Sequence, residues 1–321
     1  LYGIMPCNGL VYSPPHPCAC YPEAKLYGFT ALAATSPTRA LPEEVPEDTR
    51  SERGPAYGEA LAEQSASEKA WPMYRADAAR SGANASAVPA DLQPRWELEL
   101  DGKLTQPIVA DGLLFVAEVD RHRVHAVDAE TGQRRWSFAA GGRIDSAPTV
   151  AQGRLVFGSA DGHVVCLRAD DGVLCWRFRL APIDRRMVAF GQLESAWPVH
   201  GAVLVQNGVV TACGGRSMYL DGGLRLCRLD LATGRLLGET ILDDRDPETG
   251  QNLQVRVKGL NMPVALPDIL SSDGEHLFMR SQTMDLDGNR LALGPGKTGP
   301  DHLFSAYGFT DDSWFHRTYW L

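Results

Sequence analysis

The sequence lacks an apolar run of about 18 residues, the minimum for a membrane-spanning helix. It also lacks basic excess, because 40 Asp and Glu against 31 Lys and Arg give a formal net charge of −9. Nucleic acids and anionic membrane surfaces are polyanions, so this charge argues against either as the main partner. With 44% hydrophobic and 22% charged residues over 321 positions, the chain has the composition of a globular protein with one or two domains.

Signatures of several chemistries are missing as well. No serine nucleophile elbow, phosphate-binding glycine loop or Cys–His signature occurs. Asp285–Asn289 lacks the spaced acidic residue and closing Glu of an EF-hand, so it reads as a hairpin turn. Cys7, Cys18 and Cys20 supply half of a metal site without a second pair, and a disulfide or buried thiols are the alternatives. The sequence therefore predicts no metal site.

The two ends of the chain carry no processing signal. Leu1 is not an initiator Met and no charged n-region follows it, so no signal peptide is visible. The other end stops among aromatic residues at Leu321. We therefore expect a fragment of a larger chain, with its compartment left open.

What the sequence does contain is a repeat. Thr105–Gly112 is echoed by Ser146–Gly153, and Trp96, Trp136 and Trp176 are spaced by 40 residues (136 − 96 and 176 − 136). A period of about 40 residues with several short strands in each unit is typical of a β-propeller blade. The sequence thus predicts an all-β propeller of four-stranded antiparallel blades.

Alternating apolar residues and Gly-containing turns place the strands. Blade one is expected at 104–109, 113–119, 122–127 and 133–138. Blade two is expected at 146–150, 154–159, 163–168 and 173–178. Blade three is expected at 202–205, 209–213, 224–230 and 235–242, and 262–264 with 276–279 suggests a fourth. A direct turn at Ala169–Gly172 would pair Cys166 with Cys175 across a hairpin, with buried free thiols as the default.

Outside the blades the character of the chain changes. Residues 1–34 read as a Cys/Pro-rich partial blade, and the Pro-rich, acidic residues 35–68 as a linker or surface excursion. Residues 69–321 hold the blades. We expect the ring to be incomplete within this chain or to belong to two propellers.

Ala126–Trp136 resembles the tryptophan-docking motif of quinoprotein-type propellers, Ala-x-Asp-x-x-Thr-Gly-Lys-x-x-Trp, with Gln133 in place of Lys. The resemblance implies that Trp136 wedges between blades over Ala126, while Asp128, Thr131 and Gly132 close the turn. Blade two keeps Gly172 and Trp176 but has Cys166, Arg168 and Asp171 at the Ala, Asp and Thr positions, and blade three has Gly238 in place of Trp.

Trp71–Arg75 followed by Arg80–Gly82 resembles the segment that enters quinoprotein-type propellers, and Gly141–Ser146 and Glu194–Gly201 resemble stretches of long bacterial PQQ-binding-like β-propeller repeat proteins. That resemblance implies a periplasmic or secreted protein. Quinoprotein dehydrogenases hold pyrroloquinoline quinone (PQQ) and calcium, with adjacent cysteines over the quinone, but no two cysteines are adjacent here. PQQ with calcium is therefore not expected, and blades of this type also build non-enzymatic assembly factors.

Loops at one end of the central channel are the usual binding site of a propeller, and here they carry interleaved charges. The candidates for gripping a carboxylated or hydroxylated ligand such as a uronic sugar are Arg143, Asp145, Glu194, Arg216 and Asp221. The alternative is a solvated rim or ion pairs that brace the blades. The same loops hold further polar residues: Asp120, Arg121, His122, Ser146, Asp161, His163, Arg185, Arg186 and Ser217.

Catalytic interpretations of these loops are weaker. Glu194 with His200, or Asp145 with Glu194, would supply an acid and a base for a hydrolase or lyase. His122, His125 and His163 would form a metal trio only if they converged. The sequence favours a non-catalytic ligand-binding or scaffolding module whose partners are carbohydrate, another protein or the rest of its own chain. The alternative is a propeller enzyme at the channel mouth.

Overall fold

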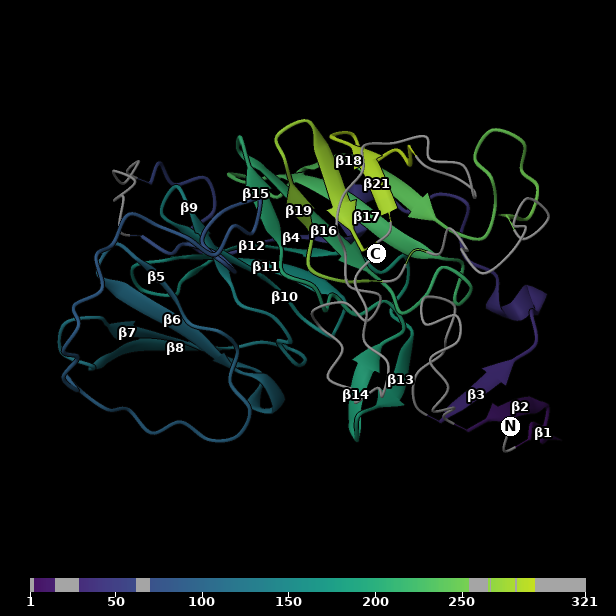
Figure 1. The fold of residues 1–321 in the computed structure, drawn as a ribbon. Helices are drawn as coiled ribbons and strands as arrows, with labels where there is room; N and C mark the ends of the chain where they lie inside the picture. The colour runs from purple at the N-terminus through teal and green to yellow at the C-terminus, as the bar shows by residue number, and fades with distance from the viewer. Residues whose placement is uncertain are drawn as a thin grey trace.

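The computed structural model describes residues 3–14, 29–61, 70–253, 265, 267–280 and 282–291. The secondary structure is almost entirely antiparallel β (Figure 1). In the described residues, three short 3-10 helices join the strands: η2 (Pro37–Arg39), η3 (Glu47–Thr49) and η4 (Val119–Arg121). No helix in these ranges is long and apolar enough to cross a membrane.

Consecutive strands pair with their neighbours to form the blades. Blade one is β5 (Ile108–Ala110), β6 (Leu113–Glu118), β7 (Arg123–Asp128) and β8 (Arg134–Ala139). Blade two is β9 (Thr149–Ala151), β10 (Arg154–Gly158), β11 (His163–Arg168) and β12 (Leu174–Arg179). Blade three is β15 (Leu204–Gln206), β16 (Val209–Gly214), β17 (Leu224–Asp230) and β18 (Leu236–Leu242).

Two smaller sheets flank these blades. β1 (Met5–Cys7), β2 (Leu10–Ser13) and β3 (Thr30–Ala33) form the N-terminal sheet. β19 (Ser271–Ser272), β20 (His276–Met279) and β21 (Gln282–Asp285) form the described part of blade four, and Asp285–Asn289 is a turn as expected. Cys18, Cys20 and the strand expected at 262–264 lie outside the described residues. The chain folds as an all-β propeller of four-stranded antiparallel blades.

The innermost strands begin later than the alternation predicts. β5 starts at Ile108 instead of Leu104, and β9 starts at Thr149 instead of Ser146. Pro107 and Pro148 stand immediately before these strands. A proline has no backbone N–H to donate, so it cannot continue a ladder of hydrogen bonds.

Tryptophans dock each blade onto the next in the same way. The indole Nε1 of Trp136 donates to the Ala169 carbonyl at 3.0 Å, and that of Trp176 donates to the Leu231 carbonyl at 3.0 Å. The ring of Trp136 covers Gly172, whose φ is 73° and where an added Cβ would lie 2.6 Å from the ring. The repeated motif therefore requires glycine at that turn for both its backbone conformation and the close approach.

Closure of the turns varies from blade to blade. In blade one, Asp128 accepts hydrogen bonds from the backbone N–H and the hydroxyl of Thr131 at 2.9 and 3.0 Å. Blade two has arginine at this position, and Arg168 pairs with Asp171 at 2.5 Å instead. A carboxylate and an ion pair thus close equivalent turns.

The thiols of blade two differ from the expected direct pairing. Cys166 lies opposite Trp176, because a β-bulge between Cys166 and Leu167 shifts the register after the turn. The predicted 166–175 pair is therefore wrong in register. Both cysteines are free and buried, and burial together with a hydrogen bond to Cys175 raises the pKa of Cys166.

The segment expected to be a linker or surface excursion adds a strand to blade two. β4 (Ser51–Arg53) pairs antiparallel with β12, so this sheet has five strands in the order β4-β12-β11-β10-β9. The Cβ that would be added at the following Gly54 meets the Leu174 carbonyl oxygen at 2.1 Å. The segment is thus packed closely onto the outer edge of the blade.

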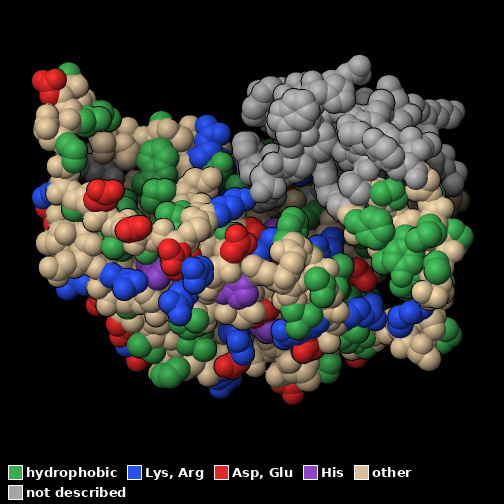
Figure 2. Space-filling model, turned by 90° about the horizontal axis from the view of Figure 1, so that it is seen from below, with side chains coloured by type: hydrophobic (Ala, Val, Ile, Leu, Met, Phe, Trp, Pro, Cys, Tyr) green, Lys and Arg blue, Asp and Glu red, His purple; other side chains and the backbone are tan. Residues whose placement is uncertain are grey.

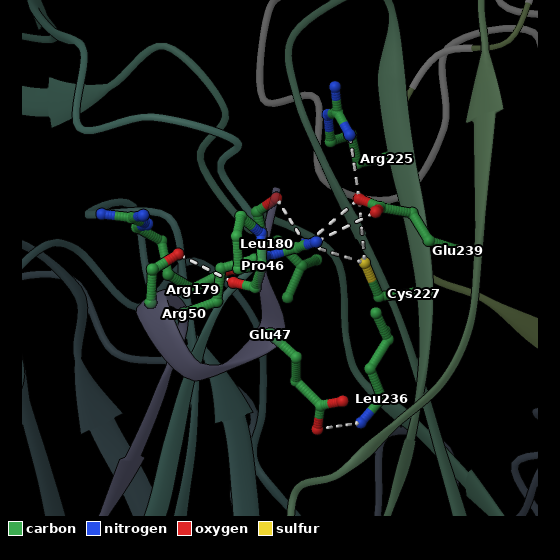
Figure 3. A network of polar contacts seen from close by, with 10 residues as sticks. Pro46, Glu47, Arg50, Arg179, Leu180, Arg225, Cys227, Leu236 and Glu239 are labelled. Carbon is green, nitrogen blue, oxygen red and sulfur yellow. Dashed lines mark hydrogen bonds and ion pairs between the residues drawn. The ribbon is translucent and has the colours of Figure 1, made fainter. Parts of the chain in front are cut away.

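Arg50 anchors this segment between blades two and three (Figure 3). Its guanidinium donates to the carbonyls of Arg179 and Leu180 at 2.8 and 3.0 Å and pairs with Glu239 at 2.9 Å. Arg225 holds the same carboxylate at 3.1 Å. Because the Arg50 side chain is fully buried, these contacts fix the excursion to the propeller core.

Candidate functional site

The candidate residues lie on the connections at one end of the blades. This is the side on which the hairpin of β13 (Arg186–Ala189) and β14 (Gln192–Ser195) projects in Figure 1. Figure 2 views the molecule from that side, and lysine and arginine, acidic and histidine side chains gather across the middle of the face. We call this the channel-mouth face.

Glu194, near the end of β14, is the centre of the polar cluster. Its carboxylate lies 2.9 Å from Arg143 Nε and 2.8 Å from Arg216 Nη2, and the side chain is buried. Arg143 belongs to the connection between blades one and two, and Arg216 follows β16 of blade three. A buried carboxylate between two arginines therefore joins three consecutive blades.

Backbone hydrogen bonds fix the segments that carry these side chains. The Ala160 N–H donates to the Arg143 carbonyl at 2.8 Å, and the Ser195 N–H donates to the Ala160 carbonyl at 2.9 Å. Gly142 packs so closely that an added Cβ would lie 2.5 Å from the Asp161 nitrogen. Glycine at this position lets the connection approach the neighbouring blade.

Asp145 extends the cluster to His200. Its Oδ2 lies 3.2 Å from Arg143 Nη2 and 2.5 Å from His200 Nδ1. Burial opposes the charged form, but the hydrogen bond from His200 and the nearby charges of His200 and Arg143 outweigh it, so the pKa of Asp145 is lowered. Asp145 is therefore ionised and orients the imidazole.

Asp221 completes the set at its outer end. Its carboxylate lies 3.6 Å from Arg185 Nη1. Burial raises the pKa of Asp221 despite the opposing charges of Arg185 and Arg216. Of the acidic residues in the cluster, Asp221 is the one whose negative charge is least balanced by nearby arginines.

The β13–β14 hairpin is held at three points, two of which involve the cluster. The guanidinium of Arg143 stacks on the Phe190 ring with its carbon 4.1 Å from the ring centre. His122 Nε2 donates to Gln192 Oε1 at 2.6 Å, and Glu194 supplies the third tie. The strands carry apolar side chains that stay exposed: Met187 by 39%, Val188 by 73%, Phe190 by 69% and Leu193 by 56%.

The structure links four of the five candidate residues through these contacts, namely Arg143, Asp145, Glu194 and Arg216, while Asp221 pairs with Arg185 instead. It separates the predicted catalytic sets. Glu194 pairs with arginines while His200 pairs with Asp145. His122, His125 and His163 take different partners: Gln192, Glu118 and Asp161. Within the described ranges, no three His, Cys, Asp or Glu side chains gather as metal ligands.

Sequence reasoning missed the hairpin itself. Phe190 and Gly191, with φ of 51° and 74°, form its two-residue turn. A glycine in a two-residue turn is a recognised hairpin signal, so the Phe190–Gly191 pair offered a clue. The chain on either side lacks regular apolar alternation, and that hid the two strands.

The residues described at the channel mouth do not fit PQQ with calcium. Arg143 and Arg216 are paired with Glu194, and Arg185 with Asp221. They therefore offer no unpaired arginine cluster for a polyanionic quinone. The described acidic residues also form no group of three that could ligate a cation.

Comparison with known proteins places the chain in a family. The family described as outer membrane protein assembly factor BamB matches residues 74–282, more than half of the chain. This protein belongs to that family. Its blades are of the PQQ type, and its relatives include both enzymes and assembly factors.

Two curated relatives show this range. The dehydrogenase subunit of a quinone-dependent alcohol dehydrogenase from Gluconacetobacter polyoxogenes is 29% identical over 160 residues, covering 46% of this chain and 21% of that protein. BamB from Yersinia pestis is 26% identical over 153 residues, covering 46% of this chain and 36% of that protein. The matched part is thus about a fifth to a third of each relative.

Among solved structures, the quinohemoprotein alcohol dehydrogenase from Comamonas testosteroni is similar, with a TM-score of 0.45 and 23% identity. That match covers 57% of this chain and 29% of the other.

Proposed function

We propose that this chain is a protein-binding scaffold module and that the β13–β14 hairpin is its docking element. The observation that carries the proposal is the contrast within the hairpin. Its base is held by a buried carboxylate between two arginines, whereas Val188, Phe190 and Leu193 present their side chains to solvent. An isolated two-stranded hairpin is marginally stable alone, so the ties at its base keep these apolar side chains in position.

The polar cluster supports a structural use of its charges. Glu194 and Asp145 together balance the charges of Arg143 and Arg216, and truncating one partner of such a buried set costs about 3–5 kcal/mol. Their arrangement holds the connections of three blades in one geometry. The channel-mouth face thus offers a rigid, largely self-neutralised platform for a partner protein.

The names of the relatives agree with this proposal. BamB of Yersinia pestis is named an assembly factor, and the Gluconacetobacter polyoxogenes protein is named a subunit. Both names describe proteins that work with other chains. We extend this to the present chain as a module of a larger assembly.

The test compares the proteins captured by the wild-type chain with those captured by a variant that lacks the apolar side chains of the hairpin. The full chain, tagged and immobilised, is exposed to extract of the source cells next to the variant V188S/F190S/L193S. We expect an identified partner to be retained by the wild type and lost, by at least about tenfold, from the variant. A matched control, V88S/L92S, removes exposed apolar side chains elsewhere. Equal capture by all three proteins would overturn the proposal.

A second candidate function is binding of a carboxylated sugar by the residues predicted from the sequence: Arg143, Asp145, Glu194, Arg216 and Asp221. The observation in its favour is that the buried Nε of Arg216 has no hydrogen-bond partner among the described residues. Titration calorimetry with galacturonate tests it, with Arg216→Ala expected to abolish the heat of binding. No heat with the wild type removes this candidate and leaves the hairpin proposal standing.

A further inference from the structure

A row of three polar side chains crosses one face of blade one and shares no residue with the cluster around Glu194. His125 of β7 lies opposite Ser137 of β8, and Glu118 of β6 lies opposite Arg123, two residues before His125. Ser137 Oγ is 2.7 Å from His125 Nδ1, and His125 Nε2 is 2.9 Å from Glu118 Oε2. Side chains alternate along strands, so this register places all three on one face.

The hydrogen bonds of Glu118 set the direction of the row. Burial opposes its charged form, but hydrogen bonds from His125 and from the Asp101 N–H lower the pKa of Glu118. An ionised carboxylate only accepts, so Nε2 of His125 carries a proton and donates it. In neutral His125, Nδ1 then accepts the hydrogen bond of the Ser137 hydroxyl, which is the relation between a general base and its nucleophile.

Access and charge differ between the two ends of the row. His125 and Glu118 are buried, whereas Ser137 is exposed on the outermost strand of the blade. A cavity of about 280 Å³ opens at the Glu118 end of the row, and its walls are Glu99, Leu100, Asp101, Glu118, Arg121, Arg123 and Arg134. Arg121 pairs with Asp101, while the side chains of Arg123 and Arg134 form no ion pair with any described residue. Beside the acidic Glu99, Asp101 and Glu118, Arg123 and Arg134 are therefore the two cationic side chains of this wall that remain available to bind an anion.

We propose that Ser137 is a nucleophile for acyl transfer from anionic esters, with His125 as its general base, Glu118 as the residue that orients the imidazole, and Arg123 with Arg134 as the anion-binding side chains. Ser137 Oγ forms a bond to the acyl carbon while its proton passes to His125 Nδ1. The ester C–O bond breaks, and the leaving alkoxide takes that proton. Water then attacks the acyl-serine through the same imidazole and releases the acid. No redox partner or metal is required.

This proposal does not rest on the scaffold function, because none of its residues belongs to the β13–β14 hairpin or to the cluster around Glu194. The test uses a fluorophosphonate probe with peptide mass spectrometry, and hydrolysis of 4-nitrophenyl hydrogen succinate next to neutral 4-nitrophenyl acetate. We expect the probe on Ser137 and a hydrolysis rate at least about 100-fold lower in Ser137→Ala, the lower range for general-base catalysis. We expect Arg123→Ala to raise KM for the anionic ester alone, by about tenfold.

Ser81→Ala is the matched control, because Ser81 is an exposed serine hydrogen-bonded to a carboxylate, Asp77, instead of an imidazole. It should keep the wild-type rate. A folded wild-type protein that leaves Ser137 unlabelled, or a Ser137→Ala variant that hydrolyses the ester as fast as wild type, would overturn the proposal. The row would then only cross-link the strands of blade one.

Discussion

Blades one and two are neighbours built on the same docking tryptophan, yet they differ in what the rest of the chain adds to them. Trp136 and Trp176 each donate to a carbonyl of the next blade at 3.0 Å. Trp176 is fully buried, whereas Trp136 is only partly covered. We attribute the difference to β4, which pairs with the outer strand of blade two, whereas no strand of the described residues pairs with the outer strand of blade one.

Comparing the two blades distinguishes features that come from the repeat from features that come from segments outside it. The repeat sets the strands and the docking geometry, and both blades share it. Segments outside the repeat supply what is particular to blade two, namely the buried anchor Arg50 and the β13–β14 hairpin that leaves the blade. We infer that the repeat carries stability and that the additions carry both extra stability and binding.

The largest expected effect is on the docking tryptophan of blade two. Trp176→Ala should lower the free energy of unfolding by about 3–5 kcal/mol, the range for a large buried aromatic side chain. Trp136→Ala should cost about half as much, because that ring is partly exposed. Chemical denaturation measures both, and equal losses would contradict the claim that β4 deepens the burial of blade two.

The second effect is on the anchor of the excursion. Arg50→Ala should lower the free energy of unfolding by about 3 kcal/mol, since removing one partner of a buried ion pair leaves the other poorly compensated. Arg53→Ala, three residues further along in β4, is the control, because Arg53 stacks on Tyr57 at the surface. A cost below about 1 kcal/mol for Arg50→Ala would show that the segment is only loosely attached.

A smaller effect is expected at the docking turn. Gly172→Ala introduces a Cβ at a φ of 73° and against the Trp136 ring, so it should cost about 2–3 kcal/mol from backbone strain and displaced packing. Gly112→Ala has a similar φ of 76° with no atom near the added Cβ, and should cost about 1 kcal/mol. Indistinguishable losses in thermal denaturation would remove the packing role of the ring.

The smallest effect concerns pH and the turn of blade one. Hydrogen bonds from Thr131 and Arg135 lower the pKa of the half-buried Asp128 to about 2. Its contribution to stability is complete above pH 3.8, its ordinary pKa, and is lost as the pH falls through about 2. Asp128→Asn should therefore flatten the acid end of the pH–stability curve. If Asp128→Asn leaves the slope of the free energy of unfolding against pH unchanged between pH 4 and 2, these hydrogen bonds do not act on the folded state alone.

The features that come from the repeat were predictable from the sequence, whereas most of those that come from the added segments were not. Ala126–Trp136 placed the blade motif, and the strands of blades one to three lie close to their predicted positions because turns and apolar alternation are local signals. Arg50 was not predictable, since its partner Glu239 lies 189 residues away. The grouping of Arg143, Glu194 and Arg216 followed from loop positions in a propeller, but the ion pairs between them depend on the three-dimensional packing.

The most direct measurement of the scaffold proposal is hydrogen exchange of the free chain and of its complex with the partner retained through the hairpin. The account predicts slowed exchange at residues 186–195, with β8 of blade one unchanged although its outer edge is open. Slowed exchange at residues 134–139, with the hairpin unchanged, would contradict it and would assign binding to blade one.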